Sequence, residues 1–210
     1  MKRTIGERST DGALYTYDGF FHKPLRQAVP EKSYRKTRHE LSDRHYVKTR
    51  PEKKALVLGI GNVLMRDDGA GVRSVESFER LYSAGPEVEC LDGGTAGSKL
   101  VQVLEGFTHV VIVDAIKDGN GPGTIRHMKA SDILKGNAAL TTAHGIGVKE
   151  LLALSAFEGR APLTTVIGIV PERVCPGLTL TETIERLLPE VASAIASELK
   201  AAGFLVKKRV

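Results

Sequence analysis

GIGNVLMRDDGAGVR, residues 59–73, is a glycine-rich turn with an acidic pair at its centre. It follows the short apolar run Ala55–Leu58, which predicts a buried first strand. The chain then turns at once, because Gly59 and Gly61 can adopt backbone dihedrals that are closed to other residues. A helix is expected to begin near Ala70. The stretch therefore predicts a strand, a tight turn and a helix.

The acidic pair of this turn, Asp67 and Asp68, has two interpretations. In an open parallel sheet, the loops that leave the carboxyl ends of the strands line the binding crevice, so the pair is placed where chemistry usually occurs. Alternatively, one of the two simply caps the helix by accepting a hydrogen bond from a backbone N–H group. Two adjacent carboxylates repel each other and exceed what one cap needs, which favours a functional role for at least one of them.

Composition points to one soluble domain with an appendage. The chain has 210 residues, of which 41% are hydrophobic, and this is enough for one full core. It has no apolar run long enough to span a membrane, and its N-terminus does not look like a secretory signal, so we expect a cytoplasmic protein without a membrane partner. The two cysteines, Cys90 and Cys175, make neither a disulfide framework nor a zinc-binding pattern.

The positive charge is concentrated at the N-terminus. Residues 1–54 carry 14 Lys and Arg against 7 Asp and Glu, whereas the rest of the chain carries 16 against 18. We expect residues 1–52 to form a basic, partly disordered extension and residues 53–210 to form the folded domain. The extension mixes basic and aromatic residues but has no nucleic-acid recognition motif, so no nucleic acid is expected as a partner. Its aromatic stretch, residues 15–21, is expected to dock on the domain or on a partner protein.

From residue 53 onward, expected strands alternate with expected helices. After the first strand, apolar residues recur at helical spacing over residues 72–82, and further strands are expected at residues 88–91, 109–113 and 163–170, with a short edge strand at residues 124–128. Strands and helices that alternate through short glycine turns predict an α/β fold, here a three-layer α/β/α sandwich around a mostly parallel central sheet.

Three helices are expected in the second half of the domain. A small helix should cover residues 131–134, and a longer one should follow His144. Thr179 and Glu182 have the spacing of a capping box at the start of the C-terminal helix. The apolar face of that helix continues past Pro189, which predicts one kinked helix.

Acidic residues and one histidine collect at the expected strand ends. Asp67 and Asp68 follow the first strand, Asp92 the second and Asp114 the third, while His144 precedes a helix. Carboxylates together with one imidazole suit a divalent metal such as nickel, zinc or manganese. Each residue alone also has an ordinary structural interpretation, such as bonding to loop N–H groups. We expect the side chains of Asp68 and His144 to lie on loops at the rim of the sheet and not in the core.

A dinucleotide-binding fold is the main alternative from the residues alone. Gly59 and Gly61 follow a strand and open a turn into a helix, as in the dinucleotide-binding fingerprint. The third glycine of that fingerprint is missing, because Leu64 occupies its position. The carboxylates of the first turn would also repel a pyrophosphate.

Five motifs in order carry a resemblance to a known family. GIGNVLMRDDGAGVR, LDGGTAG, VIVDAI, TTAHGIG and VIGIVPE resemble the hydrogenase maturation endopeptidases that process nickel-iron hydrogenase large subunits, and the resemblance covers about residues 54–203. In that family, an acidic residue at the position of Asp68, the aspartate at the position of Asp114 and the histidine at the position of His144 bind the metal. Family members carry Glu or Asp at the first of these positions, and the basic extension of this chain departs from their compact form.

The resemblance implies an aspartyl-type protease that removes a C-terminal peptide from the large-subunit precursor once nickel has been installed. The nickel would be carried mainly by the substrate, and Asp68, Asp114 and His144 would inspect it, although other divalent metals can occupy such a site. Asp68 and Asp114 would also be the catalytic carboxylates, and either a carboxylate activates water or the metal polarises the carbonyl. A metal-sensing chaperone that does not cleave the precursor is an alternative, and a nucleotide-binding module is a less favoured one.

Overall fold

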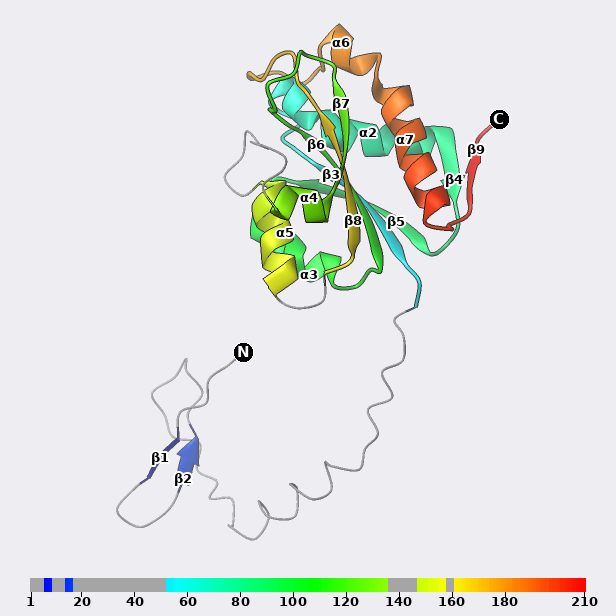
Figure 1. Ribbon diagram of the computed structural model, residues 1–210. Helices are drawn as coiled ribbons and strands as arrows, with labels where there is room; N and C mark the ends of the chain where they lie inside the picture. The colour runs from blue at the N-terminus through cyan, green and yellow to red at the C-terminus, as the bar shows by residue number, and fades with distance from the viewer. Residues whose placement is uncertain (1–5, 9–13, 17–51, 136–146, 158–160) are drawn as a thin grey trace. The chain divides into compact units, whose positions relative to one another are not determined.

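The computed structural model describes residues 6–8, 14–16, 52–135, 147–157 and 161–210 (Figure 1). The chain divides into two compact units, Met1–Arg50 and Pro51–Val210. In the first unit, β1 (Gly6–Arg8) pairs with β2 (Leu14–Thr16) in antiparallel fashion. The expected disorder of the extension concerns residues outside the described ranges, and the domain boundary at residue 52 stays a prediction.

The second unit is built on a five-stranded sheet. Its strands are β3 (Ala55–Ile60), β5 (Val88–Gly94), β6 (His109–Ala115), β7 (Ile125–Lys129) and β8 (Leu163–Ile169). Their order is β5-β3-β6-β8-β7, in which the first four are parallel and β7 is antiparallel to β8 at the edge. All five predicted strands are therefore confirmed, including the short edge strand.

Helices cover both faces of this sheet, which confirms the three-layer α/β/α prediction (Figure 1). One face carries α2 (Ala70–Leu81) and α7 (Leu188–Ala201), and the other carries α3 (Leu100–Leu104), α4 (Ala130–Leu134) and α5 (Val148–Phe157). The remaining elements are short: η1 (Arg66–Gly69), η2 (Gly97–Lys99), α6 (Glu182–Glu185), β4 (Tyr82–Ala84) and β9 (Val206–Lys208), the last two paired with each other. Within the described ranges, no helix is both long and apolar enough to cross a membrane.

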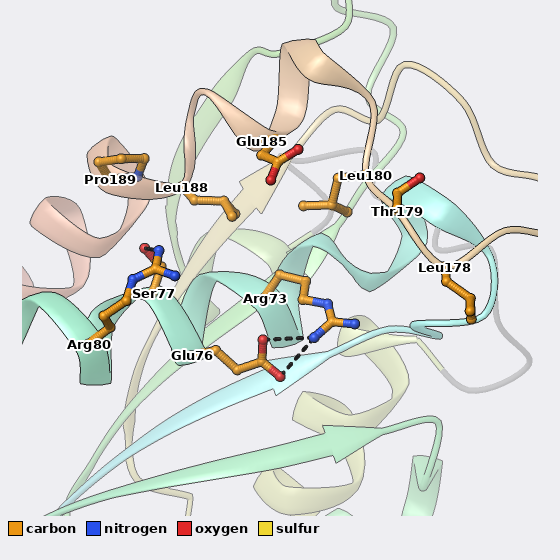
Figure 2. Close-up of a pocket in the computed structure, with 10 residues that line it drawn as sticks. All are labelled: Arg73, Glu76, Ser77, Arg80, Leu178, Thr179, Leu180, Glu185, Leu188 and Pro189. Carbon is orange, nitrogen blue, oxygen red and sulfur yellow. Dashed lines mark hydrogen bonds and ion pairs between the residues drawn. The ribbon is translucent and has the colours of Figure 1, made fainter.

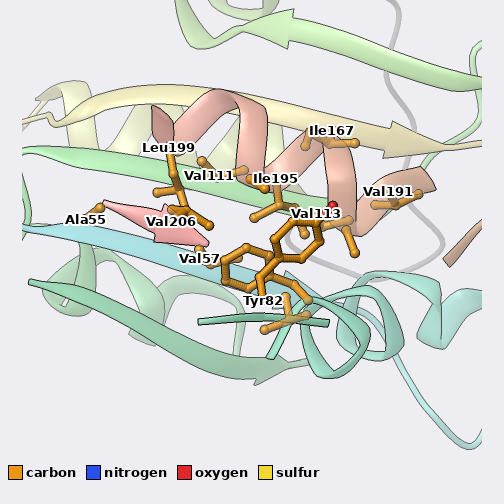
Figure 3. Packing of buried hydrophobic residues seen from close by; sticks show 14 of the residues in the cluster. Ala55, Val57, Tyr82, Val111, Val113, Ile167, Val191, Ile195, Leu199 and Val206 are labelled. Carbon is orange, nitrogen blue, oxygen red and sulfur yellow. The ribbon is translucent and has the colours of Figure 1, made fainter. Parts of the chain in front are cut away.

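The central strands are buried on both faces, which explains their apolar runs. In β3, Val57 packs on the side of α2 and α7, and Leu56 packs on the side of α3, α4 and α5. Figure 3 shows the first of these two clusters, where Val113 and Ile195 lie between the sheet and the helices. Burial of each large aliphatic side chain contributes about 1.5–3 kcal/mol, so the sheet is a rigid platform for the loops at its ends.

The C-terminal region differs from its prediction in two ways. The expected single kinked helix is two helices, α6 and α7, because Pro189 lies in the first turn of α7, where a missing N–H group costs no helical hydrogen bond. The predicted capping box is also wrong, because α6 begins after Thr181 and not after Thr179. The Thr181 hydroxyl donates instead to a carboxylate elsewhere in the fold.

The strand order marks one place where a ligand is expected to bind. The chain passes from β3 through α2 to β5 on one side of β3, and then returns through α3 to β6 on the other side. In such sheets, ligands bind outside the carboxyl ends of the strands where the order reverses. This place is at the carboxyl ends of β3 and β6, where Asp68 and Asp114 are located.

Candidate metal site

Close backbone packing brings the start of α2 against the ends of β3 and β6. A Cβ atom on Gly71 would lie 2.2 Å from the carbonyl oxygen of Ile60 and 2.3 Å from that of Val113. No side chain fits in this space, so the glycine permits the contact between the helix and the two strands. Because Val113 precedes Asp114, the contact places the turn before α2 beside that carboxylate.

The two glycines of the first turn act in different ways. Gly61 has a φ of 135°, and a Cβ atom there would lie 1.9 Å from the carbonyl oxygen of Asp68. Gly59 has no positive φ, so the expectation of special dihedrals at this residue was wrong. Gly59 is needed for its small size, because a Cβ atom would lie 2.8 Å from the carbonyl oxygen of Gly71.

The acidic pair lies in the short helix η1 and is completely buried. The expectation that Asp68 lies on an exposed rim loop was therefore wrong, because the turn packs beneath the loop that follows β8. Entry into η1 requires a left-handed residue, and Arg66 has a φ of 50°. Neither aspartate caps α2, whose first turn is preceded by Gly69 and receives no side-chain cap bond.

Asp67 is saturated with hydrogen bonds from a distant loop. Its Oδ2 accepts from the backbone N–H groups of Glu172 (3.1 Å) and Arg173 (2.8 Å) and from the hydroxyl of Thr181 (2.9 Å), and its Oδ1 accepts from the Thr181 N–H (2.7 Å). Sequence reasoning missed this role. No local signal reveals it, because the donors lie more than 100 residues away and most are backbone groups.

Asp68 accepts a hydrogen bond from within its own turn. Its Oδ2 accepts a hydrogen bond of 2.9 Å from the backbone N–H of Asn62. This bond closes the turn between β3 and η1 and fixes the direction of the carboxylate. The Asp68 carboxylate is also close enough to Asp114 for their charges to interact.

Asp114 is a buried carboxyl group with few polar neighbours that stabilise its charge. Burial raises its pKa well above the ordinary value, the Asp68 carboxylate raises the pKa further, and the nearby Ala115 N–H lowers it. Within the described ranges, neither of its oxygens has a partner that meets the geometry of a hydrogen bond. Buried polar groups are normally paired, so a buried carboxyl group without such a bond is a candidate ligand for a cation.

The other expected members of the site are placed as follows. His144 lies outside the described residues, so the convergence of Asp68, Asp114 and His144 stays a prediction. Asp92 is exposed, and its Oδ1 accepts a hydrogen bond of 2.8 Å from the N–H of Gly94 in its own turn. Among the residues that the structure describes, no cluster of three or more His, Cys, Asp or Glu could hold a metal ion. The described part of the site is thus the pair Asp68 and Asp114.

The pair suits a cation. Two buried carboxylates close to each other offer oxygen ligands and a negative potential, which favour a divalent metal and oppose a phosphate group. The poor support of Asp114 fits this role, because a bound cation would supply the stabilisation that the surrounding protein lacks. The nucleotide-binding alternative is disfavoured for the same reason.

A groove of about 350 Å³ lies between α2 and the chain that follows Gly177 (Figure 2). Its α2 wall includes Arg73 and Glu76, whose side chains form an ion pair at 2.9 Å. Its opposite wall includes Leu178, which is 70% exposed, and Leu180. This second wall belongs to the loop that Asp67 holds.

Comparisons with known proteins show which proteins this chain is similar to. A sequence model described as "Hydrogenase maturation protease" matches residues 72–198. The chain is 34% identical over 152 residues to the hydrogenase 2 maturation protease of Escherichia coli K12, covering 71% of this chain and 93% of that protein. It is 35% identical over 162 residues to the hydrogenase expression/formation protein HupD of Rhizobium leguminosarum, covering 76% of this chain and 80% of that protein. The solved structure of the hydrogenase maturating endopeptidase HybD from E. coli superimposes with a TM-score of 0.68 at 32% identity, covering 74% of this chain and 98% of that one.

Proposed function

The chain belongs to the hydrogenase maturation protease family, and we propose that it removes the C-terminal peptide from the precursor of a nickel-iron hydrogenase large subunit after nickel insertion. The observation that carries this proposal is the pair of buried carboxylates, Asp68 and Asp114, at the carboxyl ends of β3 and β6. A protease that must recognise a metal in its substrate needs ligands that are held in place and poorly satisfied by the protein itself. Asp114 meets this requirement.

The nickel is part of the substrate in this proposal. Asp68 and Asp114 would offer carboxylate oxygens, and His144 would offer an imidazole nitrogen. Three protein ligands leave coordination positions open, so the site could share an ion that the precursor already holds. Other divalent metals could occupy the same ligands.

Peptide-bond hydrolysis then has two possible sources of activation. Asp68 or Asp114 could act as the base that accepts a proton from the attacking water. The substrate nickel could instead polarise the scissile carbonyl, with the carboxylates fixing its position. In both cases the metal locates the cleavage point, which would link proteolysis to the presence of nickel.

The test compares nickel-loaded and nickel-free precursor as substrates of the full chain. Mass spectrometry of the large subunit should show loss of a C-terminal peptide only from the loaded precursor. Equal cleavage of both forms would contradict recognition through nickel. A stable complex with the loaded precursor that is never cleaved would favour the metal-sensing chaperone.

A matched pair of variants separates the site from surface carboxylates. Asp114→Asn should abolish cleavage, because the amide is a much poorer metal ligand and cannot act as a base. Asp118→Asn is the control, since Asp118 holds its own loop through Asn120 and an ion pair with Arg126. Asp118→Asn should cleave like the wild type.

A cytoplasmic location and the absence of a nucleic-acid partner stay predictions.

A further inference from the structure

Asp67 adjoins a proposed metal ligand but is itself unsuited to bind a metal. Its two oxygens already accept four hydrogen bonds of 2.7–3.1 Å, three of them on Oδ2. A metal would have to displace these donors from a side chain that is completely buried. The function of this carboxylate must therefore lie in what it holds.

Asp67 closes the loop after β8 at both of its ends. Glu172 and Arg173 donate from the beginning of the loop, and Thr181 donates from its end, just before α6. Backbone bonds reinforce the contact in the middle, where the Gly177 N–H donates to the Leu64 carbonyl at 2.9 Å. Hydrogen bonds to an ionised group are about twice as strong as neutral ones, so this side chain is the main tie between the loop and η1.

We propose that Asp67 is a positioning residue for the reaction. Its side chain clamps the loop 172–181 onto the turn that carries Asp68. Asp67 and Asp68 are consecutive in η1, so the clamp that fixes the first also fixes the backbone of the second. The same loop supplies Leu178 and Leu180 to the groove beside α2. The buried carboxylate of Asp67 thus fixes the position of both a metal ligand and a groove wall on which the precursor could lie. This inference rests on the proposed function.

The first test measures the clamp without using activity. In Asp67→Asn, the side chain keeps one acceptor oxygen but places an NH2 donor where the other carboxylate oxygen accepted, so a loop donor faces a donor and the clamp should open. Hydrogen exchange of the Glu172, Arg173 and Thr181 amides should become at least about tenfold faster, whereas amides of the central strands stay protected. Asp118→Asn is the control, because it alters a loop carboxylate that contacts none of these groups.

The second test measures the effect on the neighbouring ligand. Titration of the metal-free full chain with Ni²⁺ should give a Kd about tenfold higher for Asp67→Asn than for the wild type, at the low end of the range for groups that orient metal ligands. Thr181→Val removes one donor and should give a smaller increase. Thr181→Ser retains the hydroxyl and should restore the wild-type Kd.

A stability control separates positioning from general weakening. Ile195→Ala removes a buried side chain of α7 that takes no part in the hydrogen bonds of the clamp, and it should destabilise the fold by a similar amount. Its Ni²⁺ affinity at a temperature well below unfolding should equal that of the wild type. With loaded precursor, Asp67→Asn should both lower kcat and raise KM, because ligand and groove wall move together.

Three results would overturn the inference. Unchanged exchange of the three amides in Asp67→Asn would show that no clamp exists. An unchanged Ni²⁺ affinity, or an equal loss in Ile195→Ala, would reduce Asp67 to a purely structural residue. If the wild type itself neither binds Ni²⁺ nor cleaves, the proposed function fails and the positioning role with it, while the exchange data still decide whether the clamp exists.

Discussion

Asp67 and Asp114 are both completely buried at the carboxyl ends of the central strands, yet their surroundings are opposite. Asp67 accepts four hydrogen bonds. Asp114, within the described ranges, accepts none that meets ordinary geometry, and its pKa is raised by burial. The difference teaches that burial alone does not identify a functional carboxylate. The hydrogen bonds of Asp67 tie two parts of the fold together, whereas Asp114 makes no such bond within the described ranges.

The largest expected difference between the two residues concerns cleavage. Asp114→Asn should lower kcat/KM for nickel-loaded precursor by at least about a thousandfold, equivalent to about 4 kcal/mol, because a ligand and possible base is lost. Asp67→Asn should lower it by only about tenfold, because it acts through its neighbour. Initial rates with both variants decide this. Equal losses would remove the distinction between a ligand and a positioning residue.

The next difference concerns the free energy of unfolding, and here Asp67→Asn should be the more damaging of the two substitutions. Asp67→Asn should lower the free energy of unfolding by about 3 kcal/mol, because bonds to a charged acceptor are lost and buried N–H groups lose their partner. Urea unfolding of the metal-free protein measures this, with Asp92→Asn as the control that should change little, because Asp92 is exposed. A loss below about 1 kcal/mol would mean that the loop is held by its backbone bonds alone.

Asp114→Asn should instead stabilise the metal-free protein at neutral pH, by about 1–2 kcal/mol, because a neutral amide costs less to bury than a carboxyl group that can ionise. Unfolding in the presence of a chelator measures the gain. A loss of stability would show that Asp114 is well supported in the folded state. Asp114 would then resemble Asp67, and the comparison would fail.

The pH dependence of that gain has a definite sign. The pKa of Asp114 is raised in the folded state, so the unfolded chain releases its proton first, near pH 3.9. Stability from this group is therefore complete below that pH and falls as the pH rises toward the folded pKa. The difference between Asp114→Asn and the wild type should be absent near pH 3 and grow toward neutrality. A constant difference would contradict the raised pKa.

The sheet could be predicted from the sequence because its signals are local. Apolar runs such as Ala55–Leu58 and the β-branched run before Asp114 report burial on both faces, and glycine turns report the ends of strands. The break between α6 and α7 was missed because Pro189 fits either a kink or a helix start, and only packing chooses between them.

The site could be predicted only in part. Strand-end positions pointed to Asp68 and Asp114, because the topology of parallel sheets brings such ends together. The distinct role of Asp67 could not be found, because it depends on donors from Glu172 to Thr181 that the fold alone brings near. The buried state of both η1 carboxylates follows from the same distant loop.

The smallest expected effect sharpens the comparison with a third carboxylate. Asp92 lies near the end of β5 as Asp114 lies near the end of β6, but Asp92 is exposed, and its bond within the described residues is to the Gly94 N–H of its own turn. Asp92→Asn keeps an acceptor for that bond and loses a charge that water already solvates, so the free energy of unfolding should change by less than about 0.5 kcal/mol. Urea unfolding beside Asp114→Asn and Asp67→Asn measures all three positions on one scale. A large change at Asp92 would mean that position at a strand end, and not the pairing of the buried oxygens, determines what each carboxylate contributes.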